Sequence, residues 1–566
     1  MPFVQLITKL SNKRKSSTKS KYSLICMTDC LEIVFQYLVE DQGTLHSCIL
    51  VNRTWCRLAI PILWSDPFKN MRRKDSIRTY ISCLENSEKS LLIKESIQIP
   101  DCNSKALFDY PKYLQIFKCN HFSQILENYV NTIETQLDLG KVYMIIASII
   151  MDMIFKRSKG LRIFKYEHNH APSQKIIYTL DHLLFSFNNN TLNSAGGNRS
   201  IAPYIPLSKL TSLTFLAYIV NEENYAKIWS NFFNTLAKLA INIQEIIINF
   251  PTHDENNSFK EVFPAISNLI KSQISLKSFE MNRIDCSTID QEIIDALTTT
   301  QANSLRNFKI NGEIKFTSLI QLLENCKNLK SISMHKLSRC EDKSRNDEKL
   351  VNLSIPSLEK FYHWNPLLQF QYQTNNADEE IILIFKMASM SLKKFACSFF
   401  NRDIFRAINK YCVNLTHLCL FITSDSLERT ASVLPFMNTL SYLYLESPKV
   451  DIILFRSNML QLLGSSIPET LNHLCLNLFI SLRFLRDFLI CCNTKLSTLE
   501  IYGVADATYK FAAYISDYYD RNDQLRLLKL DRNLFLKFNS FLGHLHQKKV
   551  GFEVVESCKP TLFDEN

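Results

Sequence analysis

The chain has 566 residues, of which 46% are hydrophobic and 21% are charged. These proportions exclude a mainly disordered chain, and the length exceeds one ordinary domain, so we expect a small domain joined to a larger repeat array. The 17 cysteines form no Cys-x-x-Cys pair and no secretory signal peptide precedes them, which indicates reduced thiols in an intracellular protein. The longest apolar run, residues 142–155, is too short to cross a bilayer and predicts a buried helix.

The net charge of +10 is partly local to the first 21 residues, which hold no acidic residue. Subtracting their six basic residues from +10 leaves +4 for the rest of the chain. The six are Lys9, Lys13, Arg14, Lys15, Lys19 and Lys21. Residues 1–21 therefore predict a solvated basic tail. A nuclear-import signal and a nucleic-acid arm are the alternative interpretations.

Residues 22–68 carry three short amphipathic helical patterns, with Asp29, Thr44 and Thr54 as candidate N-caps. Leu31, Val34, Phe35 and Leu38 set the first pattern at helical spacing. A helical unit of this size is marginal alone and cannot bury all its apolar residues. The pattern therefore predicts either a corner of a larger core or a unit that a partner covers.

The same stretch resembles the F-box, in the version found in large fungal F-box families. The matching positions are Asp29, Cys30, Leu31, Phe35, Tyr37, Leu38, Thr44, Leu45, Ser47, Cys48, Leu50, Val51, Asn52, Arg53, Trp55, Cys56, Ala59, Leu63 and Trp64. Cys26-Met27 stands where many F-boxes have Leu-Pro, and Ile33 stands where an acidic residue is frequent.

The resemblance implies docking on a Skp-type adaptor and, through the adaptor, on a cullin. An amphipathic helix laid in a partner groove is a common mode of recognition. Spacing alone leaves open which apolar residues face the adaptor and which face inward. The candidate adaptor-binding residues are Leu31, Val34, Phe35, Leu45, Leu50, Val51 and Trp55.

From about residue 160 onward one phrase recurs, apolar-x-x-apolar-x-apolar. Its first residues are Leu161, Ile243, Leu276, Leu305, Leu329, Leu358, Leu392, Leu415, Leu440, Leu471, Leu496 and Leu525. The ten starts from Leu276 onward give (525 − 276)/9, about 28 residues per step. Alternation within each phrase predicts a strand, and the helical spacing between phrases predicts a helix. Stacking such units makes a continuous core.

This array resembles the leucine-rich repeats that follow many F-boxes. The predicted fold is α/β, a three-helix F-box followed by an irregular leucine-rich-repeat solenoid with parallel strands inside and helices outside. The expected segments are a tail (1–21), the F-box-like domain (22–68), a helical linker or first irregular repeats (69–160), the solenoid (161–555) and a C-terminal tail (556–566). The Asn or Cys that such repeats carry after the strand is mostly missing, so we expect a weak side-chain ladder.

If the first, fourth and sixth residues of each phrase face the core, the third, fifth and seventh face the open inner side. Several of these are aromatic, and exposed aromatics on a rigid sheet are frequent anchors of protein interfaces. The alternative is that another part of the same chain covers these aromatic residues. The candidate target-binding residues are Tyr362, Trp364, His417, Phe421, Tyr442, Tyr444, His473 and Tyr502.

No motif for catalysis or cofactor binding is present: the 10 glycines form no phosphate-binding loop, and HExxH and GxSxG are absent. His417-x-Cys419 and His473-x-Cys475 have metal-ligand chemistry, but a strand is expected between them. Two strand spacings are about 9.5 Å, too far for one zinc ion. We therefore expect no cofactor, no metal and no catalytic residue.

The resemblance then implies the substrate-recognition subunit of a Skp–cullin–F-box ubiquitin ligase, whose repeats hold an unknown target protein. Such a subunit is not itself an enzyme. A protein-interaction scaffold outside any ligase, using the same surfaces, is the alternative. We expect a cytoplasmic or nuclear protein that binds no membrane, and the sequence gives no positive reason for nucleic-acid binding.

Overall fold

The computed structural model describes residues 21–69, 75–95, 97, 106–133, 136–167, 207–216, 224–250, 262–283, 289–338, 353–364, 378–398, 401–447, 457–504, 507–538 and 550–555. The chain divides into two compact units, residues 1–276 and 277–566, which are described separately below. The expected tails therefore lie outside the described residues, except for Lys21.

Unit 1 begins with helices and continues into strand–helix repeats. Its helices are α2 (Lys21–Gln36), α3 (Gln42–Ile49), α4 (Arg53–Leu63), α5 (Asp75–Ser82), α6 (Asn86–Lys94), α7 (Cys119–Val130), α8 (Leu139–Arg157), α10 (Asn224–Leu239) and α11 (Phe263–Ser272), with short 3-10 turns η2 (Tyr110–Tyr113) and η4 (Leu207–Lys209). Its strands are β1 (Ile116–Lys118), β2 (Ile163–Glu167), β3 (Ser212–Leu216) and β4 (Glu245–Phe250).

The three expected helices exist, but none starts at its predicted cap. Helix α2 begins at Lys21, so Asp29 lies exposed in its middle. Asp41 caps α3 by accepting a hydrogen bond from the backbone N–H of Thr44 at 3.0 Å. Asn52 caps α4 by accepting from the backbone N–H of Trp55 at 2.9 Å. Asp and Asn side chains accept such bonds at least as well as Thr, so the earlier polar residue is the cap in both cases.

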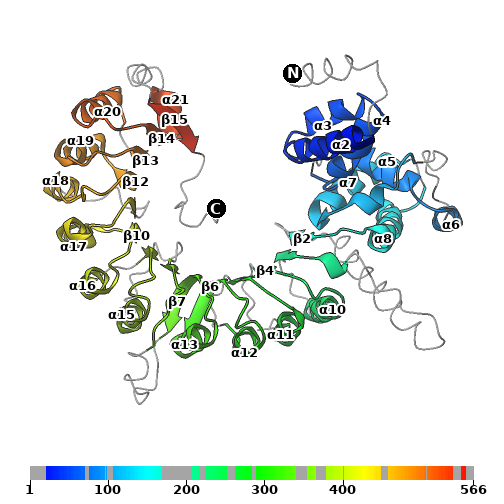
Figure 1. Cartoon of the computed structure of the whole chain (residues 1–566), viewed down its shortest axis with the longest axis horizontal. Helices are drawn as coiled ribbons and strands as arrows, with labels where there is room; N and C mark the ends of the chain where they lie inside the picture. The colour runs from blue at the N-terminus through cyan, green and yellow to red at the C-terminus, as the bar shows by residue number, and fades with distance from the viewer. Residues whose placement is uncertain are drawn as a thin grey trace. The chain divides into compact units, whose positions relative to one another are not determined.

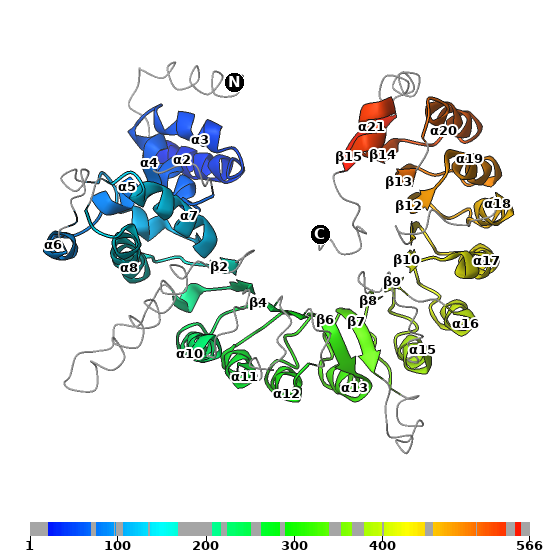
Figure 2. The same cartoon turned by 180° about the vertical axis from the view of Figure 1, so that it is seen from behind.

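Unit 2 alternates strands and helices. Its strands are β5 (Ser278–Arg283), β6 (Asn307–Lys315), β7 (Ser331–Ser338), β8 (Lys360–His363), β9 (Lys394–Cys397), β10 (His417–Phe421), β11 (Tyr442–Glu446), β12 (His473–Ile480), β13 (Thr498–Val504), β14 (Leu527–Asp531) and β15 (Gly551–Val555). Its helices are α12 (Gln291–Thr300), α13 (Phe316–Asn325), α15 (Asp378–Met387), α16 (Arg402–Tyr411), α17 (Ser424–Val433), α18 (Ser457–Ser465), α19 (Leu482–Cys491), α20 (Lys510–Arg521) and α21 (Arg532–Phe538), with η7 (Leu434–Phe436). Within this unit, helices α12 to α20 form an outer layer and the strands line the inner side (Figures 1 and 2).

The strands follow one another in sheet order from β1 to β15, and the described pairings are parallel. All twelve predicted phrases are strands, and each strand begins at the third residue of its phrase. The third residues also pair with one another, as in His417 with Tyr442 and Tyr442 with His473. The predicted α/β repeat architecture, with parallel strands inside and helices outside, is confirmed.

Three strands were missed. Strands β1 and β3 carry the same phrase, starting at Leu114 and Leu210, so their signal was present in the sequence. Strand β15 lacks an apolar first residue because Lys549 stands there. The strand layer therefore starts near residue 116, earlier than the solenoid expected from residue 161.

A side-chain ladder lies at the other end of the strand from the position where Asn or Cys was expected. A polar residue stands directly before the first residue of many phrases, and its side chain donates a hydrogen bond to a backbone carbonyl of the preceding repeat. The donors are Asn242, Asn328, Ser357, Ser391, Asn414, Thr439 and Thr470, at 2.7–3.0 Å. These bonds tie each repeat to the one before it.

The apolar run at 142–155 forms most of α8, and ten of its side chains are buried, which confirms the prediction of a buried helix. Among the residues that the structure describes, no helix combines the length and apolar character needed to cross a membrane.

Candidate functional site

Helices α2, α3 and α4 enclose a small core of their own. The rings of Phe35 and Trp55 meet edge to face, with centroids 5.2 Å apart. Leu45 and Cys48 from α3 and Ala59 from α4 complete this core. Three of the candidate adaptor-binding residues, Phe35, Leu45 and Trp55, therefore lie inside the helical unit, where they hold its shape.

The other four candidates are more accessible. Leu50 is 83% exposed, and Leu31, Val34 and Val51 are half-buried against the core. Ile33 (55% exposed) lies on α2, and Tyr37 (86% exposed) directly follows its last residue, Gln36. These two apolar residues are four positions apart in the chain. That spacing was visible in the sequence, but the candidate set did not include them.

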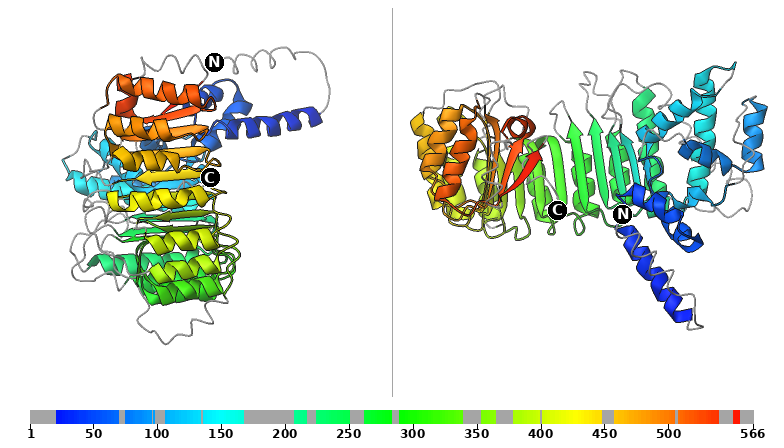
Figure 3. Two further views of the ribbon diagram at one scale, coloured as in Figure 1. Left: turned by 90° about the vertical axis from the view of Figure 1, so that its left-hand side faces the viewer. Right: turned by 90° about the horizontal axis from the view of Figure 1, so that it is seen from above.

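The exposure of these apolar residues has a structural cause. Figure 3 shows α2 extending away from the rest of unit 1, so few of its neighbours in unit 1 can cover its outer side. Burying Phe35, Leu45 and Trp55 uses one face of the helices and leaves Ile33, Tyr37 and Leu50 in solvent. Exposed apolar residues gathered on one small unit usually mark an interaction site.

The helical unit is tied to the rest of unit 1 by aromatic packing. Trp64, at the end of α4, lies 4.3 Å from the ring of Tyr110 and 5.6 Å from that of Tyr80. Phe68 is fully buried and packs on Tyr80, Phe117 and Phe122. These contacts couple α4 to α5, η2 and the start of the sheet.

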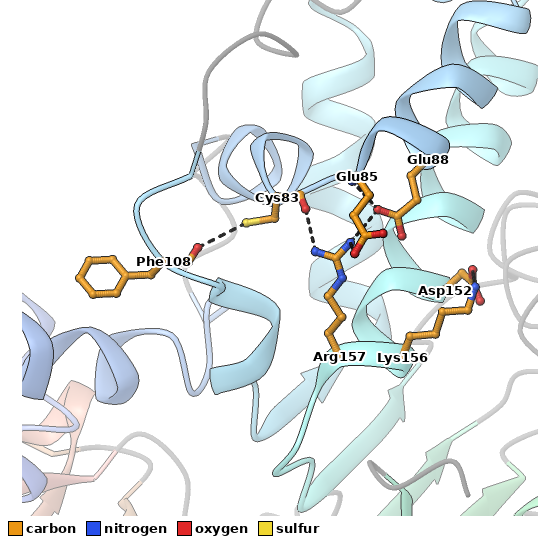
Figure 4. A network of polar contacts seen from close by, with 7 residues as sticks. All are labelled: Cys83, Glu85, Glu88, Phe108, Asp152, Lys156 and Arg157. Atoms are coloured by element: carbon orange, nitrogen blue, oxygen red, sulfur yellow. Dashed lines mark hydrogen bonds and ion pairs between the residues drawn. The ribbon is translucent and has the colours of Figure 1, made fainter. Parts of the chain in front are cut away.

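A polar network secures the next part of unit 1 (Figure 4). The Arg157 guanidinium, at the end of α8, donates to the backbone carbonyl of Cys83 at 2.7 Å. The same guanidinium pairs with Glu88 at 2.9 Å and Glu85 at 3.1 Å. Because Arg157 is mostly buried, these charge-assisted bonds fix α6 and the end of α5 on α8. The network therefore holds together α5, α6 and α8, the helices that follow the helical unit in the chain.

The inner face of unit 2 is the second candidate site, and its side chains form three rows that run across the strands. The first row holds the third residues of the phrases: Lys360, Lys394, His417, Tyr442, His473 and Thr498. The middle row holds the fifth residues: Tyr362, Ala396, Cys419, Tyr444, Cys475, Glu500 and Lys529. The last row holds the seventh residues: Trp364, Ser398, Phe421, Glu446, Asn477, Tyr502 and Asp531.

All eight candidate target-binding residues lie on this face, but their assumed exposure needs correction. Tyr362, Trp364, Tyr442, Tyr444 and Tyr502 are buried in one cluster with Cys419 and Cys475. His417, Phe421 and His473 are half-buried. Neighbouring parallel strands lie about 4.8 Å apart, so large rings in register cover one another. The rings stiffen the inner face, and their binding role stays a prediction.

A charged network crosses the middle row. The Glu500 carboxylate lies 2.7 Å from Nε2 of His473, accepts a hydrogen bond from the Tyr502 hydroxyl at 3.0 Å and pairs with Lys529 at 3.4 Å. Burial alone would raise the pKa of Glu500, but the bond and charge of His473, the charge of Lys529 and the Tyr502 hydroxyl lower it to about 2. Glu500 is therefore a buried anion that these partners neutralise.

Burial makes several of the described thiols poor nucleophiles. Burial raises the pKa of the Cys326 and Cys492 thiols to about 11 and that of Cys412 to about 12, whereas a nucleophilic thiol needs a lowered pKa. Strand β11 separates Cys419 from Cys475, as expected. In the described part of the chain, no cluster of three or more His, Cys, Asp or Glu side chains is arranged to hold a metal ion.

Fold and sites together define a repeat protein of stacked strand–helix units that carries a small helical unit before them. No family model matches the sequence, and no curated protein matches it. Among solved structures, the crystal structure of the Rad7 and Elc1 complex in yeast is similar, with a TM-score of 0.34 and 17% identity, covering 67% of this chain and 91% of that chain. Similarity of this size carries no argument about function, which therefore has to come from the residues of this chain.

Proposed function

We propose that the chain is a substrate-recognition subunit of a Skp–cullin–F-box ubiquitin ligase. Helices α2 to α4 dock a Skp-type adaptor, the adaptor joins the chain to a cullin, and the inner face of unit 2 holds the target protein. The chain itself catalyses nothing: its role is to position a target, which requires a stiff scaffold. It acts in the cytoplasm or the nucleus.

One observation supports this proposal above the others. The segment that resembles the F-box folds its own core and still leaves Ile33, Tyr37 and Leu50 exposed. Three exposed apolar side chains on one short helical unit are typical of an interaction site.

The test is co-purification of the full chain with a Skp-type adaptor, comparing Leu50→Asp with Leu107→Asp. Both leucines are highly exposed, at 83% and 89%, so neither change should disturb the fold. A carboxylate at residue 50 would be buried without a partner in the complex, so Leu50→Asp should weaken binding about tenfold or more. Leu107→Asp should bind like the native chain.

Two outcomes would overturn the proposal: a native chain that does not bind the adaptor at micromolar concentration, or equal binding by both variants. Circular dichroism of each variant shows that its helices are intact. Assembly with the adaptor but no cullin recruitment and no ubiquitin transfer to bound proteins would instead favour the scaffold alternative.

A further inference from the structure

The first row of the inner face begins with three basic groups on adjacent strands. Lys360, Lys394 and His417 are the third residues of β8, β9 and β10, and they pair in register. Their side chains share one face of the sheet, and adjacent parallel strands lie about 4.8 Å apart. We call Lys360, Lys394 and His417 the basic row.

No acidic group neutralises the two lysines of the basic row in the described part of the chain. Other lysines of unit 2 are paired: Lys309 with Glu280 at 2.9 Å, and Lys336 with Glu313 at 3.0 Å. At the far end of the same face, Lys529 pairs with Glu500 at 3.4 Å. Lys360 and Lys394 are half-buried and stand beside a like charge, an arrangement that costs stability.

The electrostatics of the row agree with this geometry. Burial and the charge of Lys360 lower the pKa of Lys394. Burial and the charges of Lys394, His473 and Lys360 lower the pKa of His417 to about 4, so its ring is neutral near pH 7. The row therefore presents two ammonium groups and a neutral imidazole that stacks on Tyr442, with ring centroids 5.3 Å apart. An anion placed here would relieve the repulsion between the lysines.

From this arrangement we propose that the basic row binds carboxylate side chains of an extended acidic peptide segment of the target, lying across strands β8 to β10. The inference rests on the proposed function only in naming the ligand as a target protein. The site is short, and acids such as Glu446 lie elsewhere on the same face. Two unpaired cations suit one or two carboxylates and are too few for the continuous phosphate backbone of a nucleic acid.

The experiment measures binding of the full chain, without adaptor, to two fluorescent peptides by anisotropy. One peptide carries a central Asp-Glu-Asp, and its matched partner carries Asn-Gln-Asn. The acidic peptide should bind about tenfold more tightly or better, and the difference should shrink as salt rises from about 50 mM to about 300 mM. Equal binding of the two peptides would overturn the proposal.

Variants locate the site. Lys360→Gln and Lys394→Gln remove the charge but keep a polar side chain, one atom shorter, and should each weaken binding of the acidic peptide about tenfold. Lys510→Gln, an exposed lysine at the start of α20, removes the same charge from the outer layer and should bind like the native chain. The double variant Lys360→Glu, Lys394→Glu should reverse the preference toward a Lys-rich peptide. An equal effect of Lys510→Gln would show a nonspecific charge effect and end the proposal.

Two further measurements distinguish this proposal from adaptor docking and from nucleic-acid binding. Leu50→Asp should bind the acidic peptide like the native chain, so loss of adaptor docking leaves this result unchanged. A single-stranded oligonucleotide of equal charge should compete more weakly than the acidic peptide. Stronger competition by the oligonucleotide would overturn the proposal in favour of a nucleic-acid surface.

Discussion

Among single residues, His363 is unusual because it is a histidine at a core-facing position. It is the sixth residue of its phrase, a core-facing position that Leu420, Leu445 and Leu476 fill in other repeats. Its ring is buried, and in the described part of the chain neither ring nitrogen has a hydrogen-bond partner. Burial and the charge of His335 lower its pKa from 6.5 to about 4. The native fold thus requires a neutral histidine there.

We predict that His363→Leu raises the free energy of unfolding by about 1–2 kcal/mol at pH 7, because it removes an unpaired buried polar ring. The unfolded chain binds the proton more readily than the native chain, so this histidine costs more stability as pH falls from 6.5 toward 4. The gain from His363→Leu should therefore grow over that range. Urea unfolding at several pH values measures it.

The matched comparison is His121→Leu, whose ring nitrogen pairs with the Phe68 carbonyl oxygen at 3.1 Å. Losing that bond should lower stability. If His363→Leu is equally destabilising, the ring has a partner and its position is not a strained one.

Glu500 gives a second prediction at this scale, because its pKa is also lowered in the native chain. Its native pKa of about 2 lies below the ordinary 4.5, so the carboxylate stabilises the fold above pH 4.5 and loses this effect as pH falls toward 2. Glu500→Gln should cost about 1–3 kcal/mol at pH 7. The difference from the native chain should shrink as the pH falls below 4.5. Glu553→Gln, a half-exposed partner of Lys529, should cost little. Equal costs for both variants would contradict the central role of Glu500.

At the scale of elements, the helices of unit 2 stack side by side in the outer layer (Figure 3). Helices α18 and α19 approach closely at Gly464. A Cβ atom there would collide with the backbone carbonyl oxygen of Phe488 and lie 3.3 Å from the Cβ of Cys491. Backbone cannot give way as a flexible side chain does, so the small residue sets the spacing of the two helices.

We predict that Gly464→Ala lowers the free energy of unfolding by about 1–3 kcal/mol, because the two helices have to move apart. Gly43→Ala in α3 is the control: its Cβ would make only an ordinary contact at 3.5 Å with Asp41. Alanine favours a helix, so Gly43→Ala should be neutral or stabilising. Thermal unfolding of both variants decides the matter, and equal stability of the two would contradict the close approach.

At the scale of the whole molecule, a stacked array protects its members unequally. Each inner strand has a neighbour on both sides, whereas β15 pairs only with β14 among the described strands. Its residues are also mostly exposed, whereas β11 is almost wholly buried. In such arrays stability is roughly a sum of repeat and neighbour contributions, so end repeats open first.

Amide hydrogen exchange should therefore be at least about tenfold faster in residues 551–555 than in residues 442–446. The comparison is made within one sample by mass spectrometry of peptides, with β10 as an internal reference. Equal protection of β15 and β11 would mean that another element covers the end strand.

The repeat phrase made most of the fold predictable. Apolar residues at positions one, four and six suit a strand with one face on a core, and each of the twelve phrases contains a strand that begins at its third residue. The missed strands β1 and β3 carry the same phrase, so the sequence holds the signal for them as well. Helix starts were less predictable, because Asp41 and Thr44, or Asn52 and Thr54, are both competent caps, and the earlier residue is the cap in each case.

The repeat phrase was enough to predict the order and register of twelve strands and which residues share the inner face, because a side-chain period of two and a recurring phrase leave one consistent arrangement. The accessibility of those residues became clear only from the folded chain. Phe35 and Trp55 turn into the helical core while Tyr37 and Leu50 stay in solvent. The inner aromatics bury one another and leave Lys360 and Lys394 without an acidic partner among the described residues. Burial depends on neighbours that are distant in the chain, and spacing along one segment carries no record of them.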